Sequence, residues 1–226
     1  MPSSTEVVAQ HSLQHHFANM EQQRESSTLG MWLFLVTEIM FFGGLFASYL
    51  VYRLLHPGAF EFGSEHMEFW LGTINTVILL CSSLTVALSV HAAQLGRNKI
   101  VAILLIITVL MGLGFLCIKG VEYHNHWVEG SFPGHWWHMD TSTLRGDDVS
   151  AAQLFFFIYF VMTGLHALHV FIGMVLLSFI AYFALKGHYT AEYHNPVHVS
   201  GLYWHFVDLV WIFLYPLLYL IAHKHA

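Results

Sequence analysis

Five long runs of apolar residues dominate this 226-residue sequence. They cover roughly 31–52, 70–90, 100–121, 154–185 and 202–222. Each reaches the roughly 20 apolar residues that an α-helix needs to cross about 30 Å of hydrocarbon. Because lipid offers no partner for a free backbone N–H or C=O group, spanning segments must be helices or a closed β-barrel. A barrel needs alternating apolar and polar positions, and the run IVAILLII at 100–107 does not alternate. We therefore expect an all-α integral membrane protein with five transmembrane helices.

The composition argues against a soluble fold. Apolar residues make up 56% of the chain and charged residues only 10%, whereas soluble domains have about 45–50% and about 25%. Eight Lys and Arg against fourteen Asp and Glu give a net charge of −6, which argues against a nucleic-acid partner. Both cysteines, Cys81 and Cys117, lie inside apolar runs, so we expect no disulfide framework.

Two polar segments flank or interrupt the predicted membrane domain, which covers 29–226. Residues 1–28 are polar and lack a basic stretch followed by a short apolar run, so we expect no cleavable signal peptide. Segment 124–150 is rich in His and Trp, and such aromatic residues favour the membrane–water boundary. We predict that it forms a loop on the membrane surface.

The basic residues orient the chain only weakly. With the N-terminus inside, the inner side holds Arg24, Arg97, Lys99 and Lys186, and the outer side holds Arg53, Lys119, Arg145 and Lys224. Four against four gives no decision by the positive-inside rule. The Arg97 and Lys99 pair in the shortest loop favours an inside N-terminus and an outside C-terminus.

Glu38 is the most conspicuous polar residue, because it lies about two turns into the first apolar run with no basic residue within one turn. A charge there would cost at least about 2.5–3.5 kcal/mol on insertion scales. A partnerless carboxyl is therefore expected to be protonated. It could exchange protons or bind a lipid headgroup, or it could be a neutral carboxyl hydrogen-bonded to a neighbouring helix. The sequence leaves these interpretations open.

Further polar residues lie in the other apolar runs, and we expect them to form interhelical polar contacts. They are His91, Lys119, Glu122, His166, His169 and Asp208. Lys119 and Glu122 are three residues apart and can neutralise each other on one helical face. His166 and His169 are also three apart, but two imidazoles do not make a metal site, and the Glu-x-x-His motif of di-iron bundles does not occur. The loop histidines show no zinc-like spacing with cysteine, so we expect no metal in this chain.

Five sequence blocks together resemble, in order and spacing, subunit III of the haem–copper oxidases, the cytochrome c oxidase type. The blocks are GMWLFLVTEIMFFGGLFASY, INTVILLCSSLTVALSVHA, KGVEYHNH, TGLHALHVFIG and YWHFVDLVWIFLYPLLYL. The first carries Glu38 in the place of the family's buried glutamate, and the last matches the family's closing signature most closely. The chain is similar to the five-helix bacterial form, which lacks the first two helices of the seven-helix form. One departure is His198, where the family often has an acidic residue before the last helix.

The resemblance implies a V-shaped bundle, two helices against the remainder, with phospholipid bound in its cleft. It implies that this chain holds no haem or copper and that these lie in partner subunits. The implied partners are the catalytic subunit I, subunit II and optionally a small subunit IV, in a bacterial inner membrane. Glu38 would face the cleft, with Trp32, Arg53 and His205 as candidates for lipid contact, and the subunit would support proton uptake and turnover stability.

Alternative functions remain open at this stage. A subunit of the same fold could serve a quinol oxidase or a nitric oxide reductase. A different class is a stand-alone proton-coupled carrier built around Glu38, His166 and His169. Carriers commonly show internal repeats and broken helices, and no internal repeat is visible here.

Overall fold

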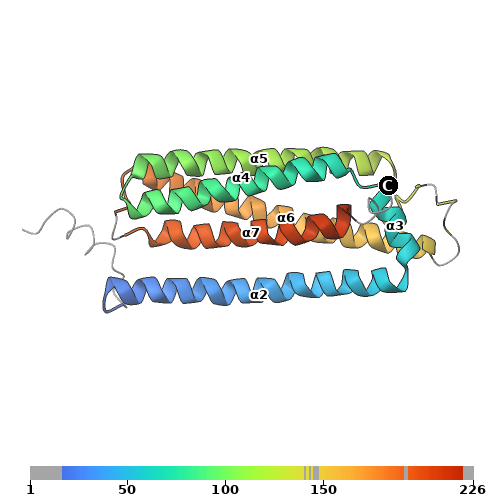
Figure 1. The fold of residues 1–226 in the computed structure, drawn as a ribbon, viewed down its shortest axis with the longest axis horizontal. Coiled ribbons are helices and arrows are strands. Elements are labelled where there is room, and N and C mark those ends of the chain that lie inside the picture. The colour runs from blue at the N-terminus through green and yellow to red at the C-terminus, as the bar shows by residue number, and fades with distance from the viewer. Residues whose placement is uncertain (1–16, 140, 143, 145–147, 191–192, 221–226) are drawn as a thin grey trace, which may run out of the picture.

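A computed structural model describes residues 17–139, 141–142, 144, 148–190 and 193–220. Its helices, in chain order, are α2 (Met20–Leu55), α3 (Pro57–Glu65), α4 (Phe69–Gln94), α5 (Asn98–Val128), α6 (Asp148–Leu185) and α7 (Asn195–Tyr219) (Figure 1). All but α3 are long and apolar enough to cross a membrane. This confirms the predicted all-α membrane fold with five spanning helices.

The four helices α4 to α7 form a closed ring, because α4 contacts α5 and α7, and α6 contacts the same two helices. Helix α2 runs alongside this ring and contacts α6, α7 and α3 (Figure 1). Only 11% of the most apolar window of α2 is buried, against 56% for α7. Within the described part of the chain the spanning helices therefore divide one against four, whereas the resemblance implies two against the remainder.

The helix α2 begins earlier than the sequence suggested. The Asn19 side chain accepts a 2.8 Å hydrogen bond from the backbone N–H of Gln22 and so caps the helix. Glu21 in the first turn is favourable for the helix dipole. Residues 20–28 of the predicted polar N-terminal segment therefore continue the first spanning helix. Residues 1–16 lie outside the described chain.

The predicted loop 124–150 is shorter than expected, because α5 extends to Val128 and α6 begins at Asp148. Two contacts fix the extra turn of α5. Asn125 donates a 2.7 Å hydrogen bond to Glu68, and the His126 ring packs edge-on against Tyr159 of α6. The added packing outweighs the polar character that suggested a loop.

The last spanning helix also begins earlier than predicted, at Asn195 rather than at 202. Pro196 lies in its first turn, where the missing N–H of proline has no consequence. The final two residues of the predicted span, 221 and 222, lie outside the described chain.

The short helix α3 was not predicted. It follows α2 directly, starts with Pro57, and packs across one end of the bundle (Figure 1). Its Phe60 ring meets Tyr49 of α2 and Phe155 of α6 edge-on, at centroid distances of 5.2 and 5.3 Å. Gly63 lies so close to Phe155 that an added Cβ would approach the ring to 2.2 Å. Helix α3 therefore links α2 to α6.

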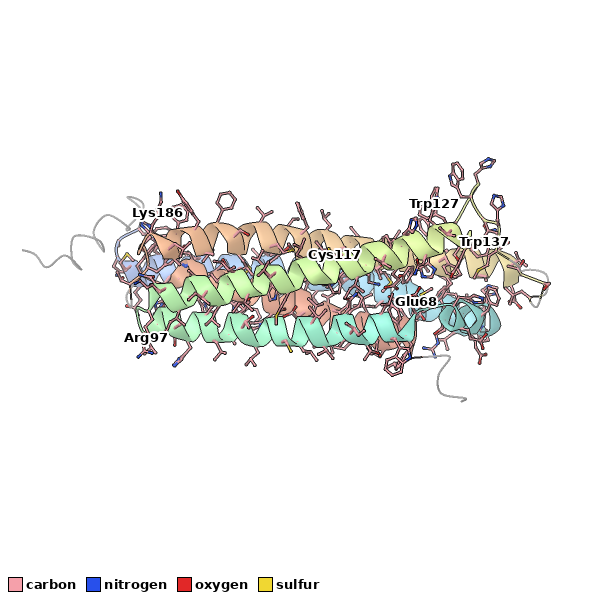
Figure 2. The ribbon with its side chains drawn as sticks, turned by 90° about the horizontal axis from the view of Figure 1, so that it is seen from above. Glu68, Arg97, Cys117, Trp127, Trp137 and Lys186 are labelled. Atoms are coloured by element: carbon pink, nitrogen blue, oxygen red, sulfur yellow. The ribbon has the colours of Figure 1, made fainter. Side chains whose placement is uncertain are left out.

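The two ends of the bundle differ in side-chain chemistry. Arg97 and Lys186 lie at one end, and Trp127 and Trp137 lie at the other (Figure 2). Many large apolar side chains between the ends point outward, as expected for helices that face lipid.

Candidate functional site

The most deeply buried charges belong to Lys119 and Glu122 of α5. The Lys119 Nζ lies 3.0 Å from Glu122 Oε2, and the side chains are 4% and 0% exposed. An isolated charge at this depth would be strongly destabilising, and here each side chain is the counter-charge of the other. The structure thus shows the pair that the three-residue spacing predicts.

Two tyrosines from other helices complete this arrangement. The hydroxyl of Tyr159 on α6 donates a 2.6 Å hydrogen bond to Glu122 Oε1, and the hydroxyl of Tyr219 on α7 donates to the same oxygen. Lys119 also donates to the Tyr219 hydroxyl, and its Nζ lies 4.9 Å from the ring centre of Trp211. We call Lys119, Glu122, Tyr159 and Tyr219 the Lys119 cluster. It joins α5, α6 and α7 through groups that satisfy one another.

The second polar contact joins α2 to the bundle. Glu38 Oε2 lies 3.2 Å from Nε2 of His169 on α6, and the two side chains are 20% and 14% exposed. The other ring nitrogen of His169, Nδ1, lies 2.8 Å from the carbonyl oxygen of Leu165. Because a carbonyl can only accept, Nδ1 must carry a hydrogen.

This geometry fixes how many protons the pair holds. A neutral imidazole with its hydrogen on Nδ1 has a bare Nε2, which can only accept a hydrogen bond. The contact with Glu38 therefore requires one further proton between the two side chains. It can be a protonated Glu38 that donates to neutral His169, or an ion pair of carboxylate and imidazolium. The hydrogen bond to a neighbouring helix, one of the interpretations left open by the sequence, is present.

Helices α4 and α7 are joined by side-chain hydrogen bonds along their length. Trp204 and Trp211 of α7 donate 3.0 Å hydrogen bonds to the hydroxyls of Ser82 and Thr76 of α4, respectively. His205, a candidate for lipid contact, lies 2.7 Å through its Nδ1 from the Ser83 hydroxyl and is half-buried. His205 therefore makes a polar contact inside the bundle, between α7 and α4.

Two predicted interhelical contacts, those of His166 and His91, are absent among the described residues. Both ring nitrogens of His166 lack a hydrogen-bond partner, because its ring packs instead against Phe115 and Trp211. The carboxyl of buried Asp208 interacts with the Ser83 hydroxyl of α4, although neither oxygen makes a hydrogen bond of ordinary geometry. His91 is exposed at the end of α4, where no neighbouring helix in this part of the chain covers it. For His166 and His91 the expectation of an interhelical polar contact is wrong.

The remaining candidates for lipid contact lie on α2. Trp32 is 53% exposed, and Arg53 in the last turn is half-buried. Within the described ranges, no three His, Cys, Asp or Glu side chains gather closely enough to hold a metal ion.

Sequence reasoning missed the partners of the polar residues. Tyr159 lies in the run FFFIYF and gives no signal that distinguishes it from its apolar neighbours. The contact between Glu38 and His169 spans 131 residues, so no local spacing could show it. The signal that was available was the presence of each ionisable group within a long apolar run.

Comparisons with known proteins agree on one family. The family model described as cytochrome c oxidase subunit III matches residues 5–141 and 147–223. A cytochrome c oxidase subunit 3 of Thermostichus vulcanus is 35% identical over 195 residues, which cover 86% of this chain and 87% of the relative. A quinol oxidase subunit 3 of Bacillus subtilis (strain 168) is 34% identical over 208 residues, covering 91% and 93%. A cytochrome c oxidase subunit 3 of Loxodonta africana is 31% identical over 226 residues, covering 95% and 76%.

Proposed function

Since this chain belongs to the cytochrome c oxidase subunit III family of haem–copper oxidase subunits, we propose that it is the non-redox subunit III of a respiratory terminal oxidase. In this role it packs on the catalytic subunit I, which holds the haem and copper with subunit II and reduces O2 to water with proton pumping. The subunit itself stabilises that centre and its proton uptake during turnover. A small subunit IV would be a further partner.

The observation that favours a scaffold over a carrier is the Lys119 cluster inside the four-helix ring. Lys119 and Glu122 are neutralised by each other, and the hydroxyls of Tyr159 and Tyr219 both donate to the carboxylate. A carrier needs polar groups that are left for a substrate or ion at mid-membrane. The Lys119 cluster leaves none of its groups for that purpose, which favours a rigid scaffold over transport.

The region between α2 and the bundle is the proposed lipid cleft. Glu38 is still 20% exposed while bonded to His169, so a lipid beside α2 could reach this pair. Trp32 and Arg53 lie on the same helix, nearer its two ends, and Arg53 offers bidentate donors suited to a phosphate. In this proposal Glu38 is a proton-linked carboxyl whose hydrogen bond also holds α2.

The distribution of basic residues supports an inside N-terminus. Lys119 is buried, so it is not a loop charge, and four of the other seven basic residues flank one end of the bundle. These four are Arg24, Arg97, Lys99 and Lys186. By the positive-inside rule this end would face the cytoplasm of a bacterium, with the C-terminus outside.

The second candidate is subunit III of a quinol oxidase. The relative from Bacillus subtilis carries that name and is nearly as similar as the cytochrome c oxidase relative. The electron donor binds elsewhere in such complexes in our proposal, so this chain offers no residue that distinguishes the two. The nitric oxide reductase alternative has no comparable support.

The test is to tag the chain, extract it in mild detergent and identify what co-purifies. Native mass spectrometry of the intact assembly reports partner masses, and a reduced-minus-oxidised spectrum reports haem. Haem that travels with larger membrane subunits, and that is absent from the stripped chain, is the expected result. A copper-binding subunit II would then favour cytochrome c as donor. A haem-free chain, alone or as a homo-oligomer, would overturn the proposal.

A further inference from the structure

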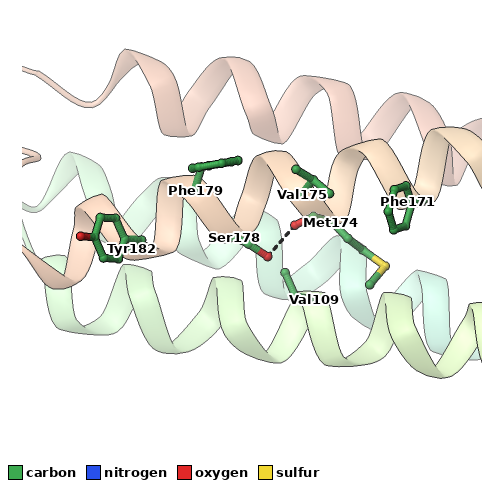
Figure 3. Close-up of a pocket in the computed structure, with 7 residues that line it drawn as sticks. All are labelled: Val109, Phe171, Met174, Val175, Ser178, Phe179 and Tyr182. Atoms are coloured by element: carbon green, nitrogen blue, oxygen red, sulfur yellow. Dashed lines mark hydrogen bonds between the residues drawn. The ribbon is translucent and has the colours of Figure 1, made fainter.

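The outer face of α5 and α6 carries a groove that none of the contacts above uses (Figure 3). It has a volume of about 470 Å³, with Val109 of α5 on one side and Phe171 and Val175 of α6 on the other. A second hollow shares Val109 and continues along the same two helices as far as Leu185. The two adjoining hollows are open on the outer surface of the bundle, and we call them together the α5–α6 groove.

The wall of the α5–α6 groove is almost entirely apolar. Its Ser178 hydroxyl donates a 2.7 Å hydrogen bond to the carbonyl oxygen of Met174, one turn earlier in the same helix (Figure 3). This bond satisfies the hydroxyl without help from a ligand. The groove therefore suits a hydrocarbon chain and offers little to a polar solute.

The groove is longer than the hydrocarbon depth of one leaflet. From Phe171 to Leu185 the helix advances by 14 residues, which is about 21 Å at 1.5 Å per residue. Half of a 30 Å hydrocarbon core is about 15 Å. A single acyl chain can thus lie along the groove with its ester end near Leu185.

A lysine stands directly at that end. Lys186 follows Leu185 in the sequence, and its Nζ lies 4.5 Å from the ring centre of Tyr182, which lines the groove. Lys186 is exposed, so its ammonium group is available to a headgroup.

The start of α5 adds more positive charge beside it. Asn98 donates a 2.6 Å hydrogen bond to the carbonyl oxygen of Tyr189, which fixes the first turn of α5 against the chain just after α6. Exposed Lys99 follows, and Arg97 precedes it at the same end of the bundle (Figure 2). Neither 94–109 nor 171–190 contains an acidic residue.

We propose that the α5–α6 groove binds one anionic glycerophospholipid, with an acyl chain between the two helices and its phosphate at Lys99 and Lys186. An apolar groove explains the chain, and the exposed Lys99 and Lys186 beside its end explain the charge of the headgroup. Basic pockets between transmembrane helices bind such headgroups on the cytoplasmic side. This site excludes α2, so it is separate from the cleft proposed beside Glu38 and does not depend on it.

The test uses the intact assembly, purified in mild detergent, delipidated and titrated with phosphatidylglycerol or phosphatidylcholine while native mass spectrometry counts retained lipids. The double variant Lys99→Gln/Lys186→Gln removes both charges from exposed positions. It is expected to weaken phosphatidylglycerol binding about thirtyfold, the change that two lysines near an anionic surface give. Arg24→Gln, at the same end of the bundle on α2, is the matched charge control and should leave retention unchanged.

A second variant tests the groove independently of charge. Ser178→Phe places a ring in the groove and should remove one bound phospholipid, whereas Leu168→Phe, at an exposed position of α6 outside the groove lining, should not. Unchanged phosphatidylglycerol retention in the double variant and in Ser178→Phe would overturn the proposal. So would equal binding of phosphatidylcholine, or the loss of a partner subunit instead of a lipid from Ser178→Phe.

Discussion

His169 presents its Nε2 to Glu38 at a distance of 3.2 Å, because its Nδ1 is occupied by the carbonyl oxygen of Leu165. This arrangement joins two roles in one contact. It holds α2 against α6, and it retains one proton between the two side chains. Another polar contact of α2 is the hydrogen bond from the Tyr49 hydroxyl to the carbonyl oxygen of Leu217. The two residues are 168 positions apart in the sequence.

Replacement of Glu38 separates those two roles. Glu38→Gln keeps a hydrogen bond, because the amide NH2 can donate to the bare Nε2 of His169, but it cannot release a proton. Glu38→Ala leaves that nitrogen unpaired, which we expect to lower the free energy of unfolding by about 1–3 kcal/mol. The measurements are detergent denaturation of the assembly and the loss of oxidase activity per turnover.

The outcomes for Glu38 discriminate between the interpretations. A Gln variant as stable as wild type that nevertheless loses activity faster during turnover would support the proton-linked role. A Gln variant that matches wild type in both measurements, and in bound lipid, would leave only the structural role. Equal destabilisation by Gln and Ala would contradict the proton arrangement described for His169.

The Lys119 cluster should respond sharply to the loss of one charge. Lys119→Met leaves the Glu122 carboxylate buried without its counter-charge, and we expect destabilisation of about 3–5 kcal/mol. Adding Glu122→Gln to the same chain should recover part of this loss, since no charge is then buried. The denaturant midpoint of the purified assembly measures both. Glu61→Gln, at an exposed position of α3, is the control and should stay within about 0.5 kcal/mol. A double variant as unstable as Lys119→Met would refute this account.

His166 should be replaceable by phenylalanine. Its two ring nitrogens have no hydrogen-bond partner in the described structure, and its ring lies 5.1 Å from Trp211 and 5.5 Å from Phe115, centre to centre. Substituting an apolar ring of similar shape for an unpaired polar one is neutral or stabilising. The melting temperature of His166→Phe should therefore equal or exceed that of wild type. The matched change His169→Phe should lower it, because the bond to Glu38 is lost; the reverse order would show that His166 has a polar partner.

Two glycines in α3 give opposite predictions. An alanine Cβ at Gly63 would meet the Phe155 ring at 2.2 Å, so Gly63→Ala should destabilise the protein by about 1–3 kcal/mol through overpacking. At Gly58 nothing lies within 4 Å of an added Cβ, so Gly58→Ala should be neutral or stabilise the helix by up to about 1 kcal/mol. Thermal denaturation of the two variants side by side checks the contact between α3 and α6. Similar melting temperatures for both would argue against it.

The sequence predicted the spanning helices because their signal is local. A run such as 100–121 is apolar throughout, and lipid allows it only one conformation. The helix ends were less well predicted, because packing extends them: the turn around His126 looks polar in sequence but is buried against Tyr159. Tertiary contacts of this kind leave no periodic pattern.

The polar sites could likewise be predicted where the signal is local and not where it depends on tertiary contacts. The pair of Lys119 and Glu122 could be predicted, since both residues lie on one helix at a spacing that lets them meet. The tyrosines that complete the Lys119 cluster come from two other helices. In the sequence they cannot be distinguished from the other aromatic residues of their apolar runs. His166 was expected to bond across helices, yet its surroundings in the bundle are set by neighbours far away in the sequence.

Because Glu38 and His169 are 131 residues apart, they are synthesised at different times. At about 5–20 residues per second, roughly 7–26 s pass between synthesis of the carboxyl and synthesis of its imidazole. For most of that interval α6 and α7, the helices that α2 contacts, have not been synthesised. Until then Glu38 lies in the bilayer without its partner. Its carboxyl must be neutral, or it must be bound by an insertion factor or by another subunit. Assembly of this protein is thus vulnerable at its beginning, and the vulnerability ends only when translation is nearly complete.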